Sequence, residues 1–255
     1  LNAQTITEQV DSSWKQTYRA VATKTNNLKH TKLVASFNYE KSQMNGEVWL
    51  KFQPHFYPTK KLVLDAKAMD IKEVALMNGA AKTKLSYTYD SLQLHIDLDK
   101  TYTAKESYTI YIKYIARPNE YKGKGSEAIR DAKGLYFINA HNTQDKPQQI
   151  WTQGETESSS CWFPCIDKPN EKCSQQIAIT VQEKYTTLSN GLLASSKQNK
   201  DGTRTDVWVQ QQEHAPYLFM MAVGEFSITK DTWRGLPVNY YVEPEQEIHA
   251  QRIFG

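Results

Sequence analysis

A glutamine and a glutamate two positions apart, Gln153 and Glu155, are the residues of this 255-residue chain whose types and spacing best suit binding chemistry. Side chains two apart on an extended backbone point to the same face, so the pair would lie together. A carboxylate can hold a primary ammonium, and an amide can bond a nearby carbonyl. Gly154 between them would let another backbone or a ligand approach closely. The spacing alone favours the ordinary alternative, a solvated Glu155 and a Gln153 bonded to a neighbouring strand.

Other catalytic and metal-binding patterns are missing from the sequence. No two histidines stand three to five residues apart, and there is no HExxH, GxSxG, P-loop or GxGxxG pattern. The cysteines Cys161, Cys165 and Cys173 follow a C-x3-C-x7-C spacing with no CxxC and no histidine nearby, which argues against a zinc site and a disulfide framework. We therefore expect no metal or cofactor to bind within this chain, and three free, buried thiols.

Composition argues against two further classes of partner. The formal net charge is +3 and the lysines are spread along the chain, whereas a nucleic-acid surface needs a dense basic stripe. No apolar run approaches the roughly 20 residues that span a bilayer. We therefore expect no nucleic-acid partner and no membrane span. The compartment stays unknown, because a start at Leu1-Asn2-Ala3-Gln4 without Met favours export, to the periplasm or cell surface, while free cysteines favour the cytoplasm.

Alternation of apolar and polar residues fills most of the chain and predicts strands with one buried and one solvated face. Met44-Asn45-Gly46 is predicted as a turn, and the continuously apolar stretch 218–223 as a strand covered on both faces. The predicted fold class is all-β and mainly antiparallel, a β sandwich or saddle-shaped sheet. The predicted strands lie around residues 33–39, 48–52, 92–98, 108–114, 135–137, 177–181, 206–210 and 236–242.

Both ends of the chain depart from this alternation. Thr5-Ile6-Thr7-Glu8 has the capping-box form, and apolar residues recur four apart from Ile6 to Tyr18, as on one face of a helix. Residues 1–28 are therefore predicted as a short N-terminal helix or arm, and residues 29–242 as the β domain. After Pro244 the alternation stops. Residues 243–255 are predicted as a linker, able to open a helix, that leads into a further domain.

Two motifs stand at a fixed spacing in the middle of the chain. Thr152-Gln153-Gly154-Glu155 is followed, after seven residues, by Phe163-Pro164-Cys165-Ile166-Asp167-Lys168-Pro169. This pattern resembles the T-Q-x-E and F-P-C-x-D-x-P signature in the N-terminal β domain of the M1-type (gluzincin) zinc aminopeptidases. The resemblance covers roughly residues 29–242. It extends to Gly134-Leu135-Tyr136, to Ser189-Asn190-Gly191 and to the stretch 215–226, which are similar to other steps of that domain.

The resemblance implies a function for the pair described above. In that family the T-Q-x-E loop enters the active-site cleft of the next domain, where the Glu binds the free α-amino group of the substrate and the Gln helps to hold its first residue. Carried over, these residues are Glu155 and Gln153. The complete protein would be an enzyme that removes N-terminal amino acids from peptides, with zinc bound in a C-terminal catalytic domain. The present chain would be inactive alone, and its partners would be peptides with a free N-terminus and that catalytic domain.

The resemblance also implies structural roles around the second motif. Trp162, Phe163 and Cys165 would pack in the core, and Asp167 would accept hydrogen bonds from backbone donors. The chain departs from the family pattern at two places. Ser160-Cys161 stand where the family often has an arginine pair, and Lys168 stands where it often has Glu. These departures bear on domain contacts and substrate preference.

Two other functions stay open at this point. The chain could be a noncatalytic interaction scaffold of the same fold, as in relatives that have lost the zinc site. It could also be an unrelated glycan-binding or adhesive β sandwich that uses Trp49 and Trp208 as exposed aromatic platforms. An HExxH motif with a downstream Glu beyond Gly255 would distinguish the aminopeptidase from the scaffold.

Overall fold

Four β-sheets account for most of the chain in the computed structural model, which describes residues 23–123 and 131–254. One α-helix, α1 (Glu247–Phe254), occurs in these two ranges. The all-β, mainly antiparallel fold class is therefore confirmed. Most of the predicted N-terminal helix or arm lies outside the described residues, and the first strand already begins at Asn26.

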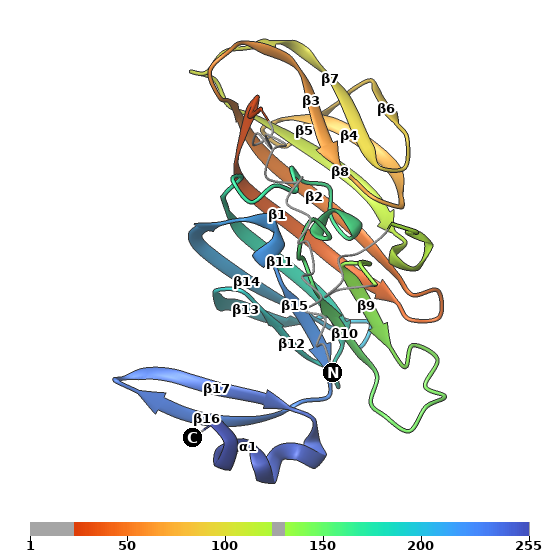
Figure 1. Cartoon of the computed structure of the whole chain (residues 1–255), viewed down its shortest axis with the longest axis vertical. Helices are drawn as coiled ribbons and strands as arrows, with labels where there is room; N and C mark the ends of the chain where they lie inside the picture. The colour runs from red at the N-terminus through yellow and green to blue at the C-terminus, as the bar shows by residue number, and fades with distance from the viewer. Residues whose placement is uncertain (1–22, 124–130, 255) are drawn as a thin grey trace, which may run out of the picture.

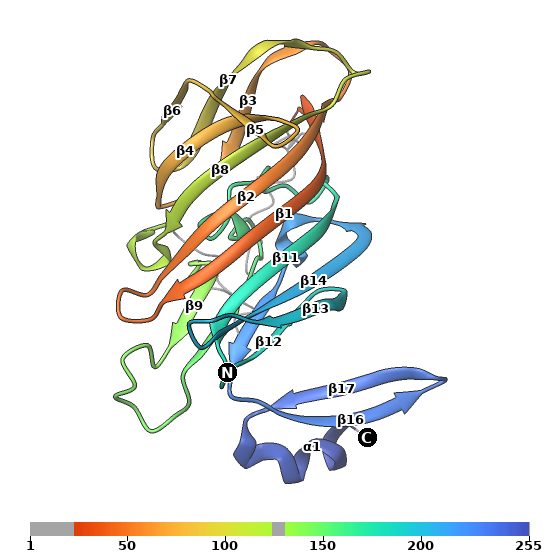
Figure 2. The ribbon, with the colours of Figure 1, turned by 180° about the vertical axis from the view of Figure 1, so that it is seen from behind.

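The largest sheet has eight strands in the order β13-β14-β11-β1-β2-β8-β4-β5, which lie side by side in Figure 2. Its centre is β1 (Asn26–Asn38), which pairs antiparallel with β2 and parallel with β11. The other strands are β2 (Gln43–Pro54), β4 (Met69–Asn78), β5 (Ala81–Lys84), β8 (Tyr108–Ala116), β11 (Cys173–Gln182), β13 (Leu192–Gln198) and β14 (Thr203–His214).

Two smaller sheets cover one face of the large sheet, one at each end (Figure 1). The first has the order β3-β7-β6, with β3 (Thr59–Asp65), β7 (Gln93–Tyr102) and β6 (Tyr87–Tyr89). The second has the order β12-β15-β10-β9, with β12 (Thr186–Ser189), β15 (Met221–Gly224), β10 (Gln149–Thr152) and β9 (Leu135–Ile138). The apolar positions of the alternating strands form the core between the layers, as Leu94, Ile96 and Leu98 of β7 do.

The C-terminal part forms a separate unit at one end of the molecule (Figure 1). The hairpin β16 (Ser227–Trp233) and β17 (Leu236–Val242) packs against α1, with Tyr240 stacked on Phe254 at 5.3 Å between ring centroids. Residues 243–255, predicted as a linker, therefore include the 3-10 turn Pro244–Gln246 and α1. Several apolar side chains of this unit are exposed, among them Trp233, Leu236, Ile248 and Phe254.

Three local predictions are wrong, two of them because of contacts with distant residues and one because of a nearby proline. Met44-Asn45-Gly46 lies inside β2, where a Cβ at Gly46 would overlap the Tyr114 ring. The stretch 218–223 is not one buried strand, because Pro216 starts a 3-10 turn that ends at Leu218, and Leu218 is 47% exposed. Trp208 is no surface platform, since it is 7% exposed and donates from Nε1 to Thr187.

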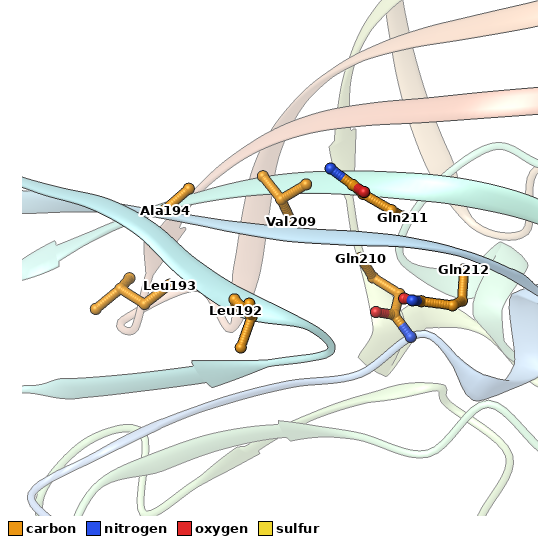
Figure 3. Close-up of a pocket in the computed structure, with 7 residues that line it drawn as sticks. All are labelled: Leu192, Leu193, Ala194, Val209, Gln210, Gln211 and Gln212. Atoms are coloured by element: carbon orange, nitrogen blue, oxygen red, sulfur yellow. The ribbon is translucent and has the colours of Figure 1, made fainter. Parts of the chain in front are cut away.

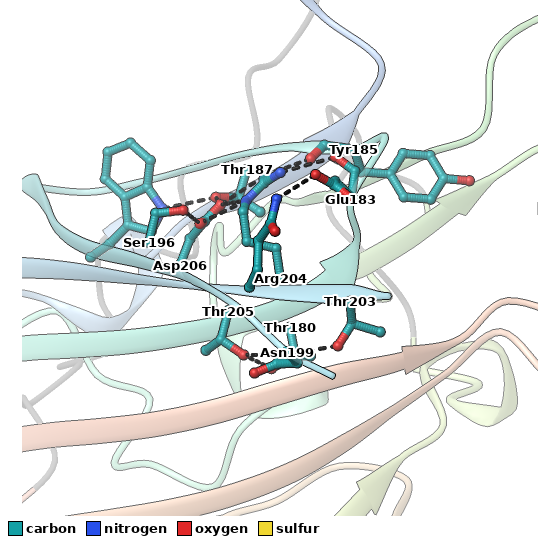
Figure 4. Close-up of polar contacts among 12 residues, drawn as sticks. Thr180, Glu183, Tyr185, Thr187, Ser196, Asn199, Thr203, Arg204, Thr205 and Asp206 are labelled. Atoms are coloured by element: carbon teal, nitrogen blue, oxygen red, sulfur yellow. Dashed lines mark hydrogen bonds and ion pairs between the residues drawn. The ribbon is translucent and has the colours of Figure 1, made fainter. Parts of the chain in front are cut away.

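A polar network ties the four-stranded sheet to the large sheet (Figure 4). Asp206 of β14 is buried and accepts hydrogen bonds from Thr187 of β12 at 2.7 Å, Ser196 of β13 at 2.6 Å and Arg204 at 2.9 Å. Arg204 also donates to the main-chain oxygen of Tyr185 at 2.7 Å. Burial raises the pKa of Asp206, but the hydrogen bonds from Arg204, Ser196 and Thr187 outweigh it, so the pKa lies below its ordinary value. The charged form is therefore the one that this network stabilises.

We predict that Asp206→Ala lowers the free energy of unfolding at pH 7 by about 3 kcal/mol, the lower end of the range for breaking a buried pair. The lower end applies because the Arg204 side chain keeps 20% exposure. Since the folded pKa of Asp206 is lowered, its contribution is present at neutral pH and is lost as the pH falls through that pKa. Urea unfolding at pH 7 measures the loss. Asp97→Ala, at an exposed position on β7, is the control, and a loss no larger than that of the control would contradict the prediction.

Candidate functional site

Gln153 and Glu155 lie where β10 ends and the chain enters a loop, residues 152–165, between the two smaller sheets. The amide of Gln153 donates to the Gly134 oxygen at 2.9 Å, which extends the β9–β10 ladder by one residue. A tight turn follows, closed by the amide of Ser158 donating to the Gly154 oxygen at 2.8 Å. Gln153 is half-buried and Glu155 is exposed. The pair therefore lies at the N-terminal end of the loop, next to solvent.

The structure brings the pair together through the main chain of Glu155. Its amide donates to Gln153 Oε1 at 3.2 Å, so the Gln153 side chain folds over the turn. A cis peptide bond joins Glu155 to Thr156. Within the described ranges, neither the Glu155 carboxylate nor Gln153 Nε2 has a hydrogen-bond partner. An anionic acceptor and an amide donor are thus both open to a ligand.

Two glycines allow the loop to approach its neighbours closely. A Cβ at Gly154 would overlap the main-chain oxygen of Tyr217, which lies in the 3-10 turn Pro216–Leu218. A Cβ at Gly134 would overlap the main-chain oxygen of Ser158, and Gly134 has a φ of +71°, which favours glycine. The close approach that the sequence suggested at Gly154 is therefore made by the backbone of this chain.

The second motif anchors the loop as the resemblance implied. Trp162, Phe163 and Cys165 are fully buried, and Phe163 stacks on Phe219 at 5.2 Å between ring centroids. Asp167 Oδ2 accepts a hydrogen bond from the Ser160 amide at 2.8 Å, which confirms its expected capping role. Residues of the second motif, which follow in the same stretch of sequence, therefore fix the loop in place.

Residues of β3 and of the turn after it supply a second set of anchors that the sequence gave no signal for. Asp65 exchanges main-chain hydrogen bonds with Cys165, and its Oδ2 accepts from the Asp167 amide at 3.0 Å. The Lys67 amide donates to the Ser160 oxygen at 2.7 Å. These residues are about 100 positions away in sequence, and no local pattern connects them to the loop.

Burial sets the charge state of the groups beneath the loop. It raises the pKa of Asp167 to about 6, against the hydrogen bond from Ser160 and the nearby Lys67 ammonium. It also raises the pKa of Cys161 and Cys173 to about 12, and that of Cys165 well above its ordinary value. All three thiols are free and buried, as expected. Since the thiolate is the reactive form, they are not nucleophiles at neutral pH.

The described residues do not fit a zinc site. They contain no group of three or more His, Cys, Asp and Glu side chains placed to hold a metal ion. No step of a zinc reaction can therefore be assigned to them. In the same ranges, no helix has the length and apolar character needed to cross a membrane.

A shallow groove between β13 and β14 is a second candidate site (Figure 3). Its walls combine apolar side chains, including the 77% exposed Leu192, with three consecutive glutamines. No titratable side chain lines it, and neither Gln153 nor Glu155 belongs to it, so it offers no acid–base chemistry. The lining residues are Leu192, Leu193, Ala194, Val209, Gln210, Gln211 and Gln212.

The family model described as the Peptidase M1 N-terminal domain matches residues 27–218. The chain belongs to the M1 peptidase family. The match covers the eight-stranded sheet, the smaller sheets up to the 3-10 turn at Leu218 and the whole loop 152–165. This confirms the resemblance drawn from the motifs, and together with the burial of Trp208 it counts against an unrelated glycan-binding sandwich.

Individual relatives agree with this M1 assignment. Glutamyl aminopeptidase of Bos taurus is 36% identical over 95 residues, which cover 35% of this chain and 9% of the relative. The thyrotropin-releasing hormone-degrading ectoenzyme of Homo sapiens is 25% identical over 225 residues, covering 85% of this chain and 20% of the relative. An M1 zinc metallopeptidase structure from Deinococcus radiodurans has the same fold at a TM-score of 0.70 and 17% identity, covering 86% of this chain and 47% of that one. The chain thus spans a fifth or less of these curated relatives and about half of the solved structure.

We predict a pH dependence of stability that comes from Asp167. Its folded pKa of about 6 lies above the ordinary carboxyl value of 3.8, so its contribution to stability is full below 3.8 and is lost as the pH rises through 6. Asp167→Asn keeps an acceptor for the Ser160 amide and removes the charge. The stability of this variant relative to the native protein should therefore rise by on the order of 3 kcal/mol between pH 4 and pH 7.5.

Urea unfolding of both proteins across this pH range measures the Asp167 effect. Asp97→Asn on the exposed face of β7 is the control for an Asp-to-Asn change outside the core. A constant difference between native protein and Asp167→Asn would mean that the buried carboxyl titrates at its ordinary pKa.

Proposed function

We propose that this chain is the substrate-recognising N-terminal domain of an M1 zinc aminopeptidase, in which Glu155 binds the free α-ammonium of a peptide. The observation that carries the proposal is the exposure of the Glu155 carboxylate, without a partner among the described residues, on a loop whose other half is buried and bonded. An exposed carboxylate on a loop that is otherwise fixed in the core can bind the cationic group of a ligand.

The chemistry of the pair matches a peptide N-terminus. An α-amino group has a pKa of roughly 7.7–8.0, so a large fraction is charged at neutral pH and can form a charge-assisted pair with Glu155. Gln153 uses its Oε1 on the Glu155 amide, which leaves Nε2 to donate to the carbonyl oxygen of the first residue. An acylated N-terminus carries no charge, so the pair would select peptides with a free amine.

The hydrolytic step belongs to a part of the protein outside the described residues. The family depends on zinc, which acts as a Lewis acid and activates water when bound. The residues described here would bind and orient the peptide N-terminus. Exposed apolar side chains next to the loop, Trp151 at 39% and Leu218 at 47%, support a surface that a catalytic domain covers.

We predict that Glu155→Gln in the full-length protein lowers kcat/KM for an aminoacyl anilide about 30- to 1000-fold. The reason is that removing one partner of a desolvated charge pair costs on the order of 2–5 kcal/mol, at about 1.4 kcal/mol per tenfold. Gln153→Ala should cost less, because a neutral hydrogen bond contributes about 0.5–1.5 kcal/mol. Steady-state kinetics and thermal melts of each variant provide the measurement.

The matched control is Glu40→Gln, which removes another exposed carboxylate far from the loop in sequence. It should leave kcat/KM unchanged, and all three variants should melt close to the native protein. Near-normal kcat/KM for Glu155→Gln would show that this carboxylate does not bind the amine. A full-length protein without HExxH and without activity would favour the noncatalytic scaffold instead.

A further inference from the structure

We propose that Lys67 and Lys168 are positioning residues for Glu155, and that they act through Glu157, two residues further along the same turn. The proposal rests on the amine-binding role of Glu155 proposed above. Neither lysine touches the substrate in this arrangement. We call Lys67 and Lys168 the lysine clamp, because both bind Glu157.

The clamp holds Glu157 by its main chain and by its side chain at once. Lys67 Nζ donates to the main-chain oxygen of Glu157. Lys168 Nζ forms an ion pair with Glu157 Oε2 at 2.7 Å. Lys67 also donates its amide to the Ser160 oxygen at 2.7 Å, so a single residue bonds both ends of the segment 157–160.

Glu155 needs such support because only its main chain is bonded within the turn. Its amide donates to Gln153 Oε1 at 3.2 Å and its main-chain oxygen accepts from Ser158 Oγ at 3.4 Å, but Glu155 and Thr156 are both exposed and no side chain of the described residues holds the carboxylate. The turn is fixed on its N-terminal side by the contact of Gly154 with the Tyr217 backbone. The clamp fixes its C-terminal side. A carboxylate held between two fixed points loses less conformational freedom when it binds an ammonium.

The charge at position 168 decides whether the clamp can form. The ammonium of Lys168 meets the carboxylate of Glu157, whereas Glu at this position would place two like charges together. Such repulsion would push the turn away from its anchors. The charge of Lys168 is therefore the one that suits Glu157.

Both lysines lie close enough to Asp167 to interact with its charge, but they differ in their other surroundings. Lys67 lies near the buried groups of Asp167, Cys161 and Cys165 and lowers their pKa values, so its removal would also disturb the core. Lys168 and Glu157 are 31% and 43% exposed in their side chains, where an ion pair contributes only about 0–1 kcal/mol to stability. Lys168 is therefore the residue whose removal tests positioning without unfolding the protein.

The test is steady-state kinetics of Lys168→Met and Lys168→Glu in the full-length protein. Lys168→Met should raise KM for an aminoacyl anilide about two- to fivefold with little change in kcat, the effect of losing up to about 1 kcal/mol. Lys168→Glu should raise KM further, and the double variant Glu157→Lys with Lys168→Glu should restore it toward the native value. Lys184→Met, which breaks the more exposed ion pair with Glu225, is the control and should leave KM unchanged.

Hydrogen exchange in the same full-length variants gives a readout that does not depend on activity. The amides of Ser158, Cys161 and Trp162, which close the turn and the 3-10 segment after it, should exchange faster in Lys168→Met. Unchanged KM in Lys168→Glu, while Glu155→Gln loses activity, would overturn the clamp and leave the proposed function intact. Faster exchange without a change in KM would also overturn it, since the clamp would then order the loop without positioning Glu155. Near-normal activity of Glu155→Gln would instead refute the amine-binding role itself.

Discussion

A buried segment outside helices and sheets has to find hydrogen-bond partners for its peptide groups, and residues 158–165 meet this constraint with one short 3-10 turn, side chains and distant backbone. Ser158, Ser159 and Ser160 are no more than 3% exposed. The Ser160 amide is bonded by Asp167, the Ser160 oxygen by Lys67 and the Trp162 oxygen by Tyr114. These buried contacts fix the position of the exposed turn that carries Glu155.

Apolar burial offsets polar costs beneath the loop. Trp162 and Phe163 are fully buried, and burying a large apolar side chain stabilises a fold by about 1.5–3 kcal/mol. Against this stand the desolvated carboxyl of Asp167 and the Trp162 Nε1, which has no partner among the described residues. An unsatisfied buried donor costs about 1–3 kcal/mol, and the raised pKa of Asp167 corresponds to on the order of 3 kcal/mol at pH 7.5, so these costs cancel much of what the two aromatic rings contribute. The hydrogen bonds therefore specify the path of the loop, while the aromatic packing offsets the cost of the polar groups buried with it.

The sequence by itself determined the strand-rich fold and the place of the candidate site. One-sided burial is a local property that alternation records, and β7 follows it residue by residue, with Leu94, Ile96 and Leu98 buried. The resemblance of the two motifs to the M1 pattern pointed to Gln153 and Glu155 as the candidate pair and to Asp167 as a cap, and the structure shows Asp167 accepting from the Ser160 amide. These features could be predicted because each depends on residues that lie within a few positions of one another.

Tertiary structure alone decided how the pair is presented and what holds it. The rule for extended backbone did not describe the pair, because β10 ends at Thr152 and Gln153 then bonds the Glu155 amide. Gly46 looked like a turn residue but lies in a strand, since the Tyr114 ring crosses it. Lys67 reaches Glu157 across 90 positions of sequence. No local pattern encodes such contacts, because they exist only once the three-stranded sheet has packed on the large sheet and brought its connecting turn against the loop.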